Sequence, residues 1–192
     1  TGSVTIDDTT PTQGQTLTAS NTLADPDGLG AITYTWKADG STVGTGSTYV
    51  VTEAEVGKVI PVVASYTDGH GTAESVSSAA TSVVANVNDV PTGSVTIDDT
   101  TPTQGQTLTA SNTLADADGL GAITYTWKAD GSTVGTGTTY VVTEAEVGKV
   151  ITVVASYTDG HGTAESVGSA ATAAVANIND APTGSVTIDD TT

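Results

Sequence analysis

Ile32-Thr33-Tyr34-Thr35-Trp36-Lys37 is the stretch that decides the fold class of this chain. Successive side chains of an extended strand point to opposite faces, so Ile32, Tyr34 and Trp36 share one face. Two threonines and a lysine occupy the other face. The pattern predicts a half-buried strand with Trp36 at the centre of a core. The Asp39-Gly40 pair that follows is typical of a tight hairpin turn.

Similar short segments rich in Val, Thr and Ile surround this stretch. Gly, Asp, Asn and Pro separate them at intervals of about ten residues, which is typical of an all-β sandwich. The predicted strands contain Val4 and Ile6, Leu17 and Ala19, and residues 48–51, 59–67 and 74–85. We expect the apolar side chains of these strands to face inward and the chain to contain very little helix.

Two local features interrupt the strands. Thr52-Glu-Ala-Glu55 is a capping box, which predicts one helical turn ended by Gly57. Pro61 lies inside the predicted strand 59–67 and has no N–H to donate to a sheet. We therefore expect Pro61 to lie at a bulge or to face an unpaired side.

The chain contains two nearly identical sequence repeats. Residues 1–91 return as 92–182 with differences at only eight positions, and 183–192 copy 1–10. A repeat of this length is the size of one autonomous domain and is too long for a solenoid unit. We predict tandem sandwich domains arranged end to end, namely 1–91 with linker 86–91, 92–182 with linker 177–182, and the start of a third repeat at 183–192.

The composition limits the classes of partner. The chain has 22 acidic residues, four Lys and no Arg, giving a net charge of −18. Nucleic acids and anionic membranes need clustered basic residues, so we expect neither as a partner. No apolar run is long enough to insert into a membrane, and the absence of Cys excludes disulfides. The acidity favours cations, although it also keeps a secreted array soluble.

The motifs in each repeat resemble bacterial immunoglobulin-like repeats of giant secreted surface proteins, including repeats-in-toxin adhesins. The resemblance covers nearly all of each repeat. Its motifs follow one another in order along the predicted strands. They are Gly14-Gln-Thr-Leu17, Tyr34-x-Trp36-x-x-Asp39-Gly40, Ser47-Thr-Tyr49 and Glu55-Val-Gly-Lys58. The resemblance implies an immunoglobulin-like sandwich with its central Trp on the third strand, and a location outside the cell or on the bacterial surface.

A second resemblance is to cadherin repeats. Ala24–Gly30, Tyr66-Thr-Asp68-Gly and the linker Asn86-Val-Asn-Asp-Val-Pro91 look like the cadherin Asp-x-Asp segment, the later single Asp and the interdomain linker. In cadherins that linker binds calcium between domains. Asn86 replaces its first Asp and Val90 its last Asn, so the resemblance leaves the number of ions open. Glu53-Ala-Glu55 stands near the place of the cadherin Asp-Arg-Glu motif but matches it poorly.

The topology of an antiparallel sandwich also predicts a calcium site, independently of the family resemblance. The turn after the second strand and the turn before the last strand both return to the end where the chain enters. The turns at the other end lie beside the linker. Calcium takes six to eight oxygen ligands and suits such a concentration of carboxylates. The predicted ligands are Asn88, Asp89, Asp116, Asp118 and Asp159 at the one complete junction, with Glu53 and Glu55, and their counterparts Asp25, Asp27, Asp68, Asn179 and Asp180.

The alternative is that these residues only build turns, for which Asp, Asn and Gly are the ordinary choice. Glu55 is also explained by its capping box, and Asp39 by its hairpin. His70 and His161 stand between glycines in a turn, where a solvent-exposed role is expected.

The interpretation that follows is structural. The repeats are spacers of a bacterial cell-surface adhesin, rigidified by calcium, whose immediate partners are the neighbouring repeats. A distal surface or host ligand is bound elsewhere in the full protein. Other interpretations are a glycan- or receptor-binding module acting by repetition, an accessory domain of a secreted enzyme, and homophilic adhesion. No repeated His–carboxylate–Ser set indicates catalysis.

Overall fold

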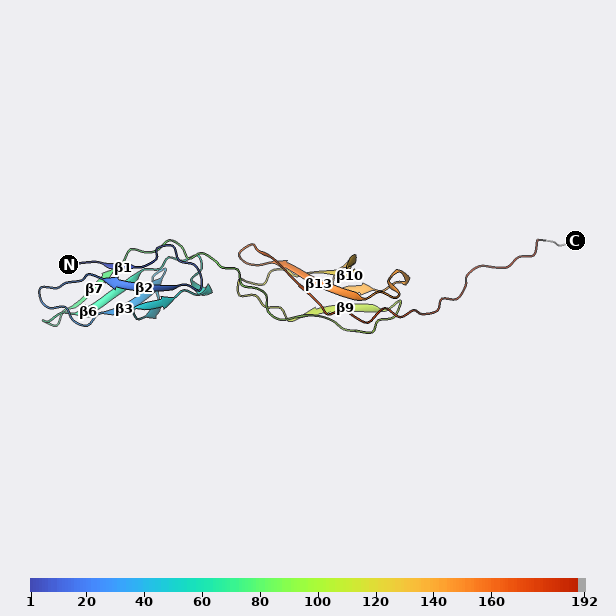
Figure 1. Cartoon of the computed structure of the whole chain (residues 1–192), viewed down its shortest axis with the longest axis horizontal. Helices are drawn as coiled ribbons and strands as arrows, with labels where there is room; N and C mark the ends of the chain where they lie inside the picture. The colour runs from blue at the N-terminus through green and yellow to red at the C-terminus, as the bar shows by residue number, and fades with distance from the viewer. Residues whose placement is uncertain (190–192) are drawn as a thin grey trace. The chain divides into compact units, whose positions relative to one another are not determined.

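The computed structural model describes residues 1–189 (Figure 1). The chain divides into two compact units, Thr1–Asp89 and Val90–Thr192. The last three residues of the expected third repeat, 190–192, lie outside the described part. Strands and two single turns of 3₁₀ helix make up all the regular structure of residues 1–189.

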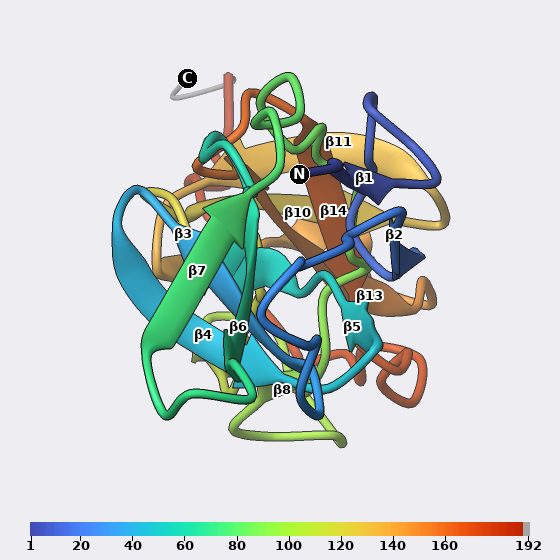
Figure 2. The same cartoon turned by 90° about the vertical axis from the view of Figure 1, so that its left-hand side faces the viewer.

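The first repeat is a sandwich of two antiparallel sheets, which Figure 2 shows from one end. One sheet has the order β1-β2-β5, and the other has the order β4-β3-β6-β7. Their bounds are Val4–Ile6 (β1), Thr16–Asn21 (β2), Thr33–Ala38 (β3), Ser41–Thr45 (β4), Thr48–Val50 (β5), Val62–Thr67 (β6) and Ala73–Ser77 (β7), with the 3₁₀ turn η1 at Glu53–Glu55.

The second repeat has the same two sheets, in the orders β12-β9-β8 and β11-β10-β13-β14. Its elements are Val95–Ile97 (β8), Thr107–Asn112 (β9), Thr124–Ala129 (β10), Ser132–Thr136 (β11), Thr139–Val141 (β12), Glu144–Glu146 (η2), Ile151–Thr158 (β13) and Ala164–Gly168 (β14). The prediction of tandem immunoglobulin-like β-sandwich domains is therefore confirmed.

A tryptophan occupies the centre of each core, as the alternation of the third strand predicts. Trp36 and Trp127 are both 0% exposed. The Trp36 indole N–H donates to the Gly46 carbonyl at 2.9 Å, and the ring stacks on Tyr49 with centroids 5.9 Å apart. This hydrogen bond satisfies the one polar atom of a fully buried indole. Leu17 and Ala19 of β2 also face the core, as predicted.

The predicted hairpin at Asp39-Gly40 is present and leads into a strand that the sequence analysis does not identify. Asp39 and Gly40 have φ of 45° and 86°, the two positive values that a type I′ turn requires. The chain then pairs back on β3 as β4. A side chain at Gly44 would come within 2.6 Å of the Tyr49 ring, so glycine is required inside this strand.

The predicted strand 59–67 begins later in the first repeat than expected. β6 starts at Val62, whereas β13 starts at Ile151, the counterpart of Ile60. Pro61 therefore lies just before its strand, neither at a bulge nor inside the ladder. The Lys37 N–H still donates to the Pro61 carbonyl at 3.0 Å, but the proline has no N–H to return.

The predicted strand 74–85 is also too long, because β7 ends at Ser77. Beyond that point, the N–H groups of Ser78 and Thr81 still donate to the Val62 and Ile60 carbonyls, at 2.9 and 3.2 Å, but the returning bonds go to side-chain oxygens. The Val62 N–H donates to Ser78 Oγ and the Ile60 N–H donates to Thr81 Oγ1, both at 3.0 Å. Hydroxyl groups compete with backbone carbonyls for such donors, so the pairing ends where these residues begin.

The predicted capping box and its single helical turn are confirmed in both repeats. Glu55 Oε2 accepts the Thr52 N–H at 2.9 Å and the Thr52 hydroxyl at 2.7 Å. Glu55 is buried, and burial would raise its pKa, but these hydrogen bonds outweigh it and the pKa is lowered. In turn, burial and the neighbouring Glu55 raise the pKa of Tyr49 to about 12.

Candidate cation site

Backbone contacts bring the predicted acidic residues of the first repeat together at one end of the sandwich. The Gly69 N–H donates to the carbonyls of Asp27 and Gly28 at 3.0 and 3.1 Å. A Cβ atom at Gly69 would overlap the Asp27 carbonyl, so only glycine allows this approach. The segment after β2 is thereby fixed against the turn after β6, and Asp25, Asp27 and Asp68 come from these two segments.

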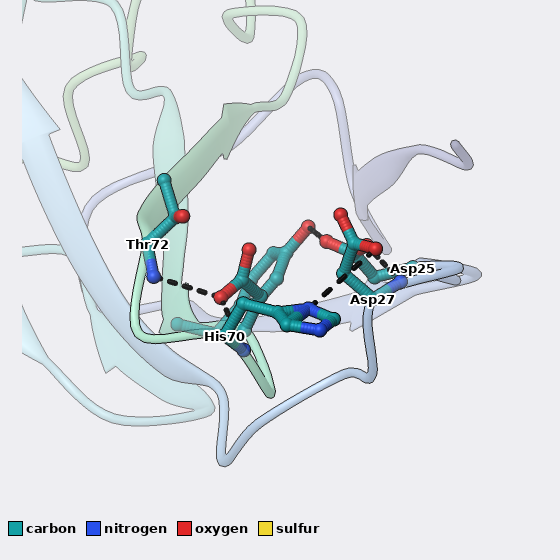
Figure 3. A network of polar contacts seen from close by, with 6 residues as sticks. Asp25, Asp27, His70 and Thr72 are labelled. Carbon is teal, nitrogen blue, oxygen red and sulfur yellow. Dashed lines mark hydrogen bonds and ion pairs between the residues drawn. The ribbon is translucent and has the colours of Figure 1, made fainter.

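Polar contacts surround these aspartates, and Figure 3 shows those of Asp25 and Asp27. Asp25 Oδ1 accepts the Asp27 N–H at 3.0 Å, and Asp25 Oδ2 accepts the Tyr66 hydroxyl at 2.9 Å. The Asp25 hydrogen bond raises the pKa of Tyr66. His70 Nδ1 lies 3.6 Å from Asp27 Oδ1, and both of these side chains are well exposed.

Asp68 is held in its charged form by the turn that it begins. Its Oδ1 accepts the N–H groups of Thr72 at 2.7 Å and His70 at 2.9 Å. The bond from the Thr72 backbone is the largest reason why the pKa of Asp68 is lowered. Three carboxylates thus lie on two neighbouring segments, and the His70 imidazole lies beside Asp27.

The second repeat builds the same arrangement. The Gly160 N–H donates to the Asp118 carbonyl at 2.9 Å, and Asp116 Oδ1 accepts the Asp118 N–H at 3.0 Å. Asp116 Oδ2 accepts the hydroxyl of Tyr157. Burial, followed by this bond to Asp116, raises the pKa of Tyr157. The pairing of Tyr66 with Asp25 and of Tyr157 with Asp116 is absent from the sequence-based site.

Asp159 gives the strongest indication that a cation fits this site. It is only 7% exposed, and its Oδ1 accepts the N–H groups of Thr163 and His161 at 2.7 and 2.9 Å. Its Oδ2 is buried without a hydrogen-bond donor. Burial would raise the pKa of Asp159, yet the backbone N–H bonds outweigh it and the pKa is lowered. A buried oxygen on an ionised carboxylate calls for a compensating charge.

Three of the other predicted ligands accept hydrogen bonds within their own repeats. Asp89 Oδ2 accepts the side-chain N–H of Gln13 at 2.6 Å, and Asp180 accepts that of Gln104 at 3.0 Å. Glu55 holds its capping box. Asn88 and Asn179 are exposed, and Glu53 is half-buried. The glutamine partners of the two linkers were not predicted, although their constant spacing of 76 residues from the aspartates repeats in both copies.

No family model matches the sequence, and no curated protein gives a significant sequence match. Similar solved structures include the fibronectin(III)-like modules of Clostridium thermocellum CbhA (19% identity, 95% of this chain, 100% of that chain, TM-score 0.33). They also include a Ca²⁺-stabilised ice-binding adhesin of an Antarctic bacterium (16%, 91%, 49%, 0.36) and the ICAM-5 D1–D4 ectodomain fragment (14%, 91%, 53%, 0.40). This chain spans about half the length of the last two.

Within residues 1–189, the structure contains no helix long and apolar enough to cross a lipid bilayer.

Proposed function

We propose that this chain is a segment of extender repeats from a bacterial surface adhesin, and that each repeat binds calcium at its three-aspartate end. The observation that carries the proposal is the duplicated acidic cluster. Two whole sandwiches, each with its own core, place the same three carboxylates on the same two segments. Each further complete domain lengthens the array and adds one more copy of the same site.

Calcium fits the donors better than other common cations. The cluster offers carboxylate oxygens from Asp116, Asp118 and Asp159, and the described chain has no cysteine for a thiolate site. Hard cations with flexible coordination prefer such all-oxygen sites, and extracellular calcium modules bind in the millimolar to submillimolar range. The buried Oδ2 of Asp159 supplies an oxygen already freed from water.

The proposal extends to the linker. Asn88 and Asp89 precede the second repeat directly in sequence, and we propose that they add ligands to its cluster. Asn88→Ala in the whole chain, compared with the unaltered chain, tests the part played by the linker.

Calorimetric titration of the whole chain with calcium tests both parts. One variant, Asp25→Asn/Asp27→Asn, disables the first cluster, and a second, Asp116→Asn/Asp118→Asn, disables the second cluster. Each should lose one class of site, and calcium should raise the unfolding temperature of the intact repeat in proportion to its occupancy. Asp130→Asn is the matched control, because Asn also tolerates the positive φ of 46° at that hairpin.

The results separate the two parts of the proposal. If the linker contributes, Asn88→Ala weakens calcium binding at the second cluster and leaves the first cluster unchanged. Unchanged affinity at both clusters would overturn the linker's role while leaving the clusters in place. No heat of binding and no thermal shift up to about 10 mM calcium, well above the affinity of extracellular modules, would overturn the calcium proposal itself.

The extender role has its own measurement. Small-angle X-ray scattering of the chain, with calcium and with a chelator, gives its maximum dimension. An extender requires a dimension well above that of a single compact body of the same mass. A profile of one compact body in both conditions would contradict this role.

No observation favours the glycan-binding alternative. The strongly exposed large apolar residues among residues 1–189 are all aliphatic, for example Leu29, Val50 and Val87. Sugar recognition by stacking uses exposed aromatic rings, and the tyrosines of this chain lie at least partly buried in or beside the cores.

A further inference from the structure

Each repeat holds the linker that follows it with one glutamine residue. In the first repeat, Gln13 Nε2 donates to Asp89 Oδ2 at 2.6 Å, and Gln13 Oε1 accepts the Val87 N–H at 3.2 Å. The Gln13 backbone N–H also donates to the Ala85 carbonyl at 3.0 Å. One residue thus contacts three alternate residues of the segment 85–89, and we call these contacts the glutamine clamp.

The turn that carries Gln13 is itself fixed to the sandwich. The Gly14 N–H donates at 2.8 Å to the carbonyl of Val51, a core residue that is 0% exposed. The Gln15 side chain accepts the Thr12 N–H at 3.1 Å and so closes the turn. The clamp is therefore attached to the core, and it fixes the linker relative to the core.

The clamp makes most of the linker 86–91 a part of the first repeat. Backbone pairing of the last segment of this repeat ends at Ala85, which forms a parallel bridge with Thr12. Beyond Ala85, the glutamine side chain makes the contacts as far as Asp89, the residue at which the first compact unit ends. The second repeat begins its backbone pairing at Thr92. Only two residues of the linker separate these points.

The second repeat has the same clamp. Gln104 Nε2 donates to Asp180 Oδ2 at 3.0 Å, Gln104 Oε1 accepts the Ile178 N–H at 3.2 Å, and the Gln104 N–H donates to the Ala176 carbonyl at 2.9 Å. Ile178 stands where the first repeat has Val87. The clamp is unchanged by this substitution because it binds the backbone at that position and not the side chain.

Glutamine suits this task because its carboxamide carries a donor and an acceptor side by side. The acceptor takes a backbone N–H, and the donor meets a carboxylate. A hydrogen bond to a charged group is stronger than one between neutral groups. Gln13 and Asp89 are both half-buried, so their bond is partly shielded from water.

We propose that Gln13 is a positioning residue, which fixes the linker to the first repeat and orients Asp89 for calcium at the cluster of the second repeat. The second of these roles rests on the proposed calcium binding. A carboxylate that binds a metal is usually hydrogen-bonded by a neighbouring group that orients it. The bond from Gln13 restricts the Asp89 side chain in advance, so less conformational entropy is lost when the ion binds.

Hydrogen exchange of single amides tests the clamp without calcium. It is measured by NMR on the whole chain with a chelator present. Gln13→Ala removes the acceptor of the Val87 N–H and should speed its exchange about fivefold, the equivalent of one ordinary hydrogen bond. Gln104→Ala is the matched control, because it makes the same change in the second repeat. It should leave Val87 unchanged and speed the exchange of Ile178.

Exchanging the two partners tests the hydrogen bond itself. Gln13→Glu places a second carboxylate beside Asp89 and should also speed the exchange of Val87. In Gln13→Glu/Asp89→Asn, the carboxylate and the carboxamide change places, so the donor and the acceptor are exchanged. This double variant should restore slow exchange. If it exchanges as fast as Gln13→Glu, the bond between the two side chains does not hold the linker, and the clamp is overturned.

Calorimetric titration with calcium tests the orientation of Asp89. The Asp25→Asn/Asp27→Asn chain serves as the background, so that the heat of binding reports the cluster of the second repeat. Gln13→Ala in this background should weaken binding about tenfold, the lower end of the range for groups that orient a metal ligand. Gln104→Ala should not weaken it, because Gln104 holds the linker after the second repeat. A residue that only stabilised its own repeat would not change binding in the other one.

The outcomes distinguish three failures. Unchanged exchange of Val87 in Gln13→Ala overturns the clamp. Faster exchange with unchanged calcium affinity overturns the orientation of Asp89 and leaves the clamp in place. If the unaltered chain binds no calcium, the proposed function and the orientation of Asp89 both fail, and the exchange of Val87 still decides the clamp. Gln13→Glu/Asp89→Asn should restore slow exchange without restoring the affinity, because the charge at residue 89 is gone.

Discussion

Replacing Trp36 by alanine tests the core on which everything else in the first repeat depends. The indole is 0% exposed, stacks on Tyr49 at 5.9 Å and donates its N–H to the Gly46 carbonyl at 2.9 Å. The substitution removes all three contributions together and leaves a cavity between the two sheets. Truncating a buried large aromatic costs about 3–5 kcal/mol.

That loss is large for a domain of this size. Small domains have total stabilities of about 5–15 kcal/mol, so the first repeat would lose a third or more of a typical value. At about 4 °C or more per kcal/mol, its unfolding temperature should fall by at least about 12 °C. Trp127, with the same burial and the same bond to Gly137, should show an equal loss in the second repeat.

Thermal unfolding followed by circular dichroism measures the fall in unfolding temperature. Tryptophan fluorescence shows which repeat unfolds early. Each repeat has a single tryptophan, so the fluorescence of the Trp36→Ala chain reports the second repeat alone. The expected result is an early transition by circular dichroism and an unchanged fluorescence transition. A shift below about 4 °C, equivalent to about 1 kcal/mol, would refute the assignment of Trp36 to the core.

Three further predictions concern the turns. Thr52→Ala should destabilise the first repeat by about 1 kcal/mol in chemical denaturation, the usual value of a lost cap. The folded state lowers the pKa of Glu55 from 4.5, so this carboxylate stabilises the fold above pH 4.5 and stops doing so as the pH falls through the lowered pKa. Glu55→Gln should therefore make the free energy of unfolding fall less steeply in acid. Gly121→Ala would overlap the Thr158 carbonyl and should destabilise the second repeat by more than about 1 kcal/mol, whereas Gly168→Ser, at an open position, should stay within about 0.5 kcal/mol.

The strand pattern and the repeat determine the fold class by themselves. Alternation places Trp36, Leu17 and Ala19 on inward faces, because a strand sends successive side chains to opposite sides. The capping box and the Asp39-Gly40 hairpin are equally local, since a few adjacent residues fix their dihedral angles and hydrogen bonds. The duplication of the domain is visible in the sequence alone.

Strand ends and side-chain partners were decided by tertiary structure. The end of β7 depends on whether Ser78 and Thr81 bind the backbone of a strand about 20 residues away, which the local pattern does not encode. Strand β4 places Gly44 against the Tyr49 ring, so the strand needs a glycine there for a tertiary reason that the local pattern does not show. Strand β6 starts late because Pro61 has no N–H to donate to β3, the neighbouring strand in the sheet.

The acidic site shows the same division. The order of strands and turns predicts that Asp25, Asp27 and Asp68 lie at the same end of the sandwich, because alternate turns of an antiparallel fold return to one end. Only the folded chain shows that Tyr66 binds Asp25. Only the folded chain shows that Asp159 keeps an unpartnered buried oxygen, because burial depends on atoms distant in sequence. The order of the strands thus determines which segments meet, and side-chain packing determines which carboxylate oxygens are left to bind a cation.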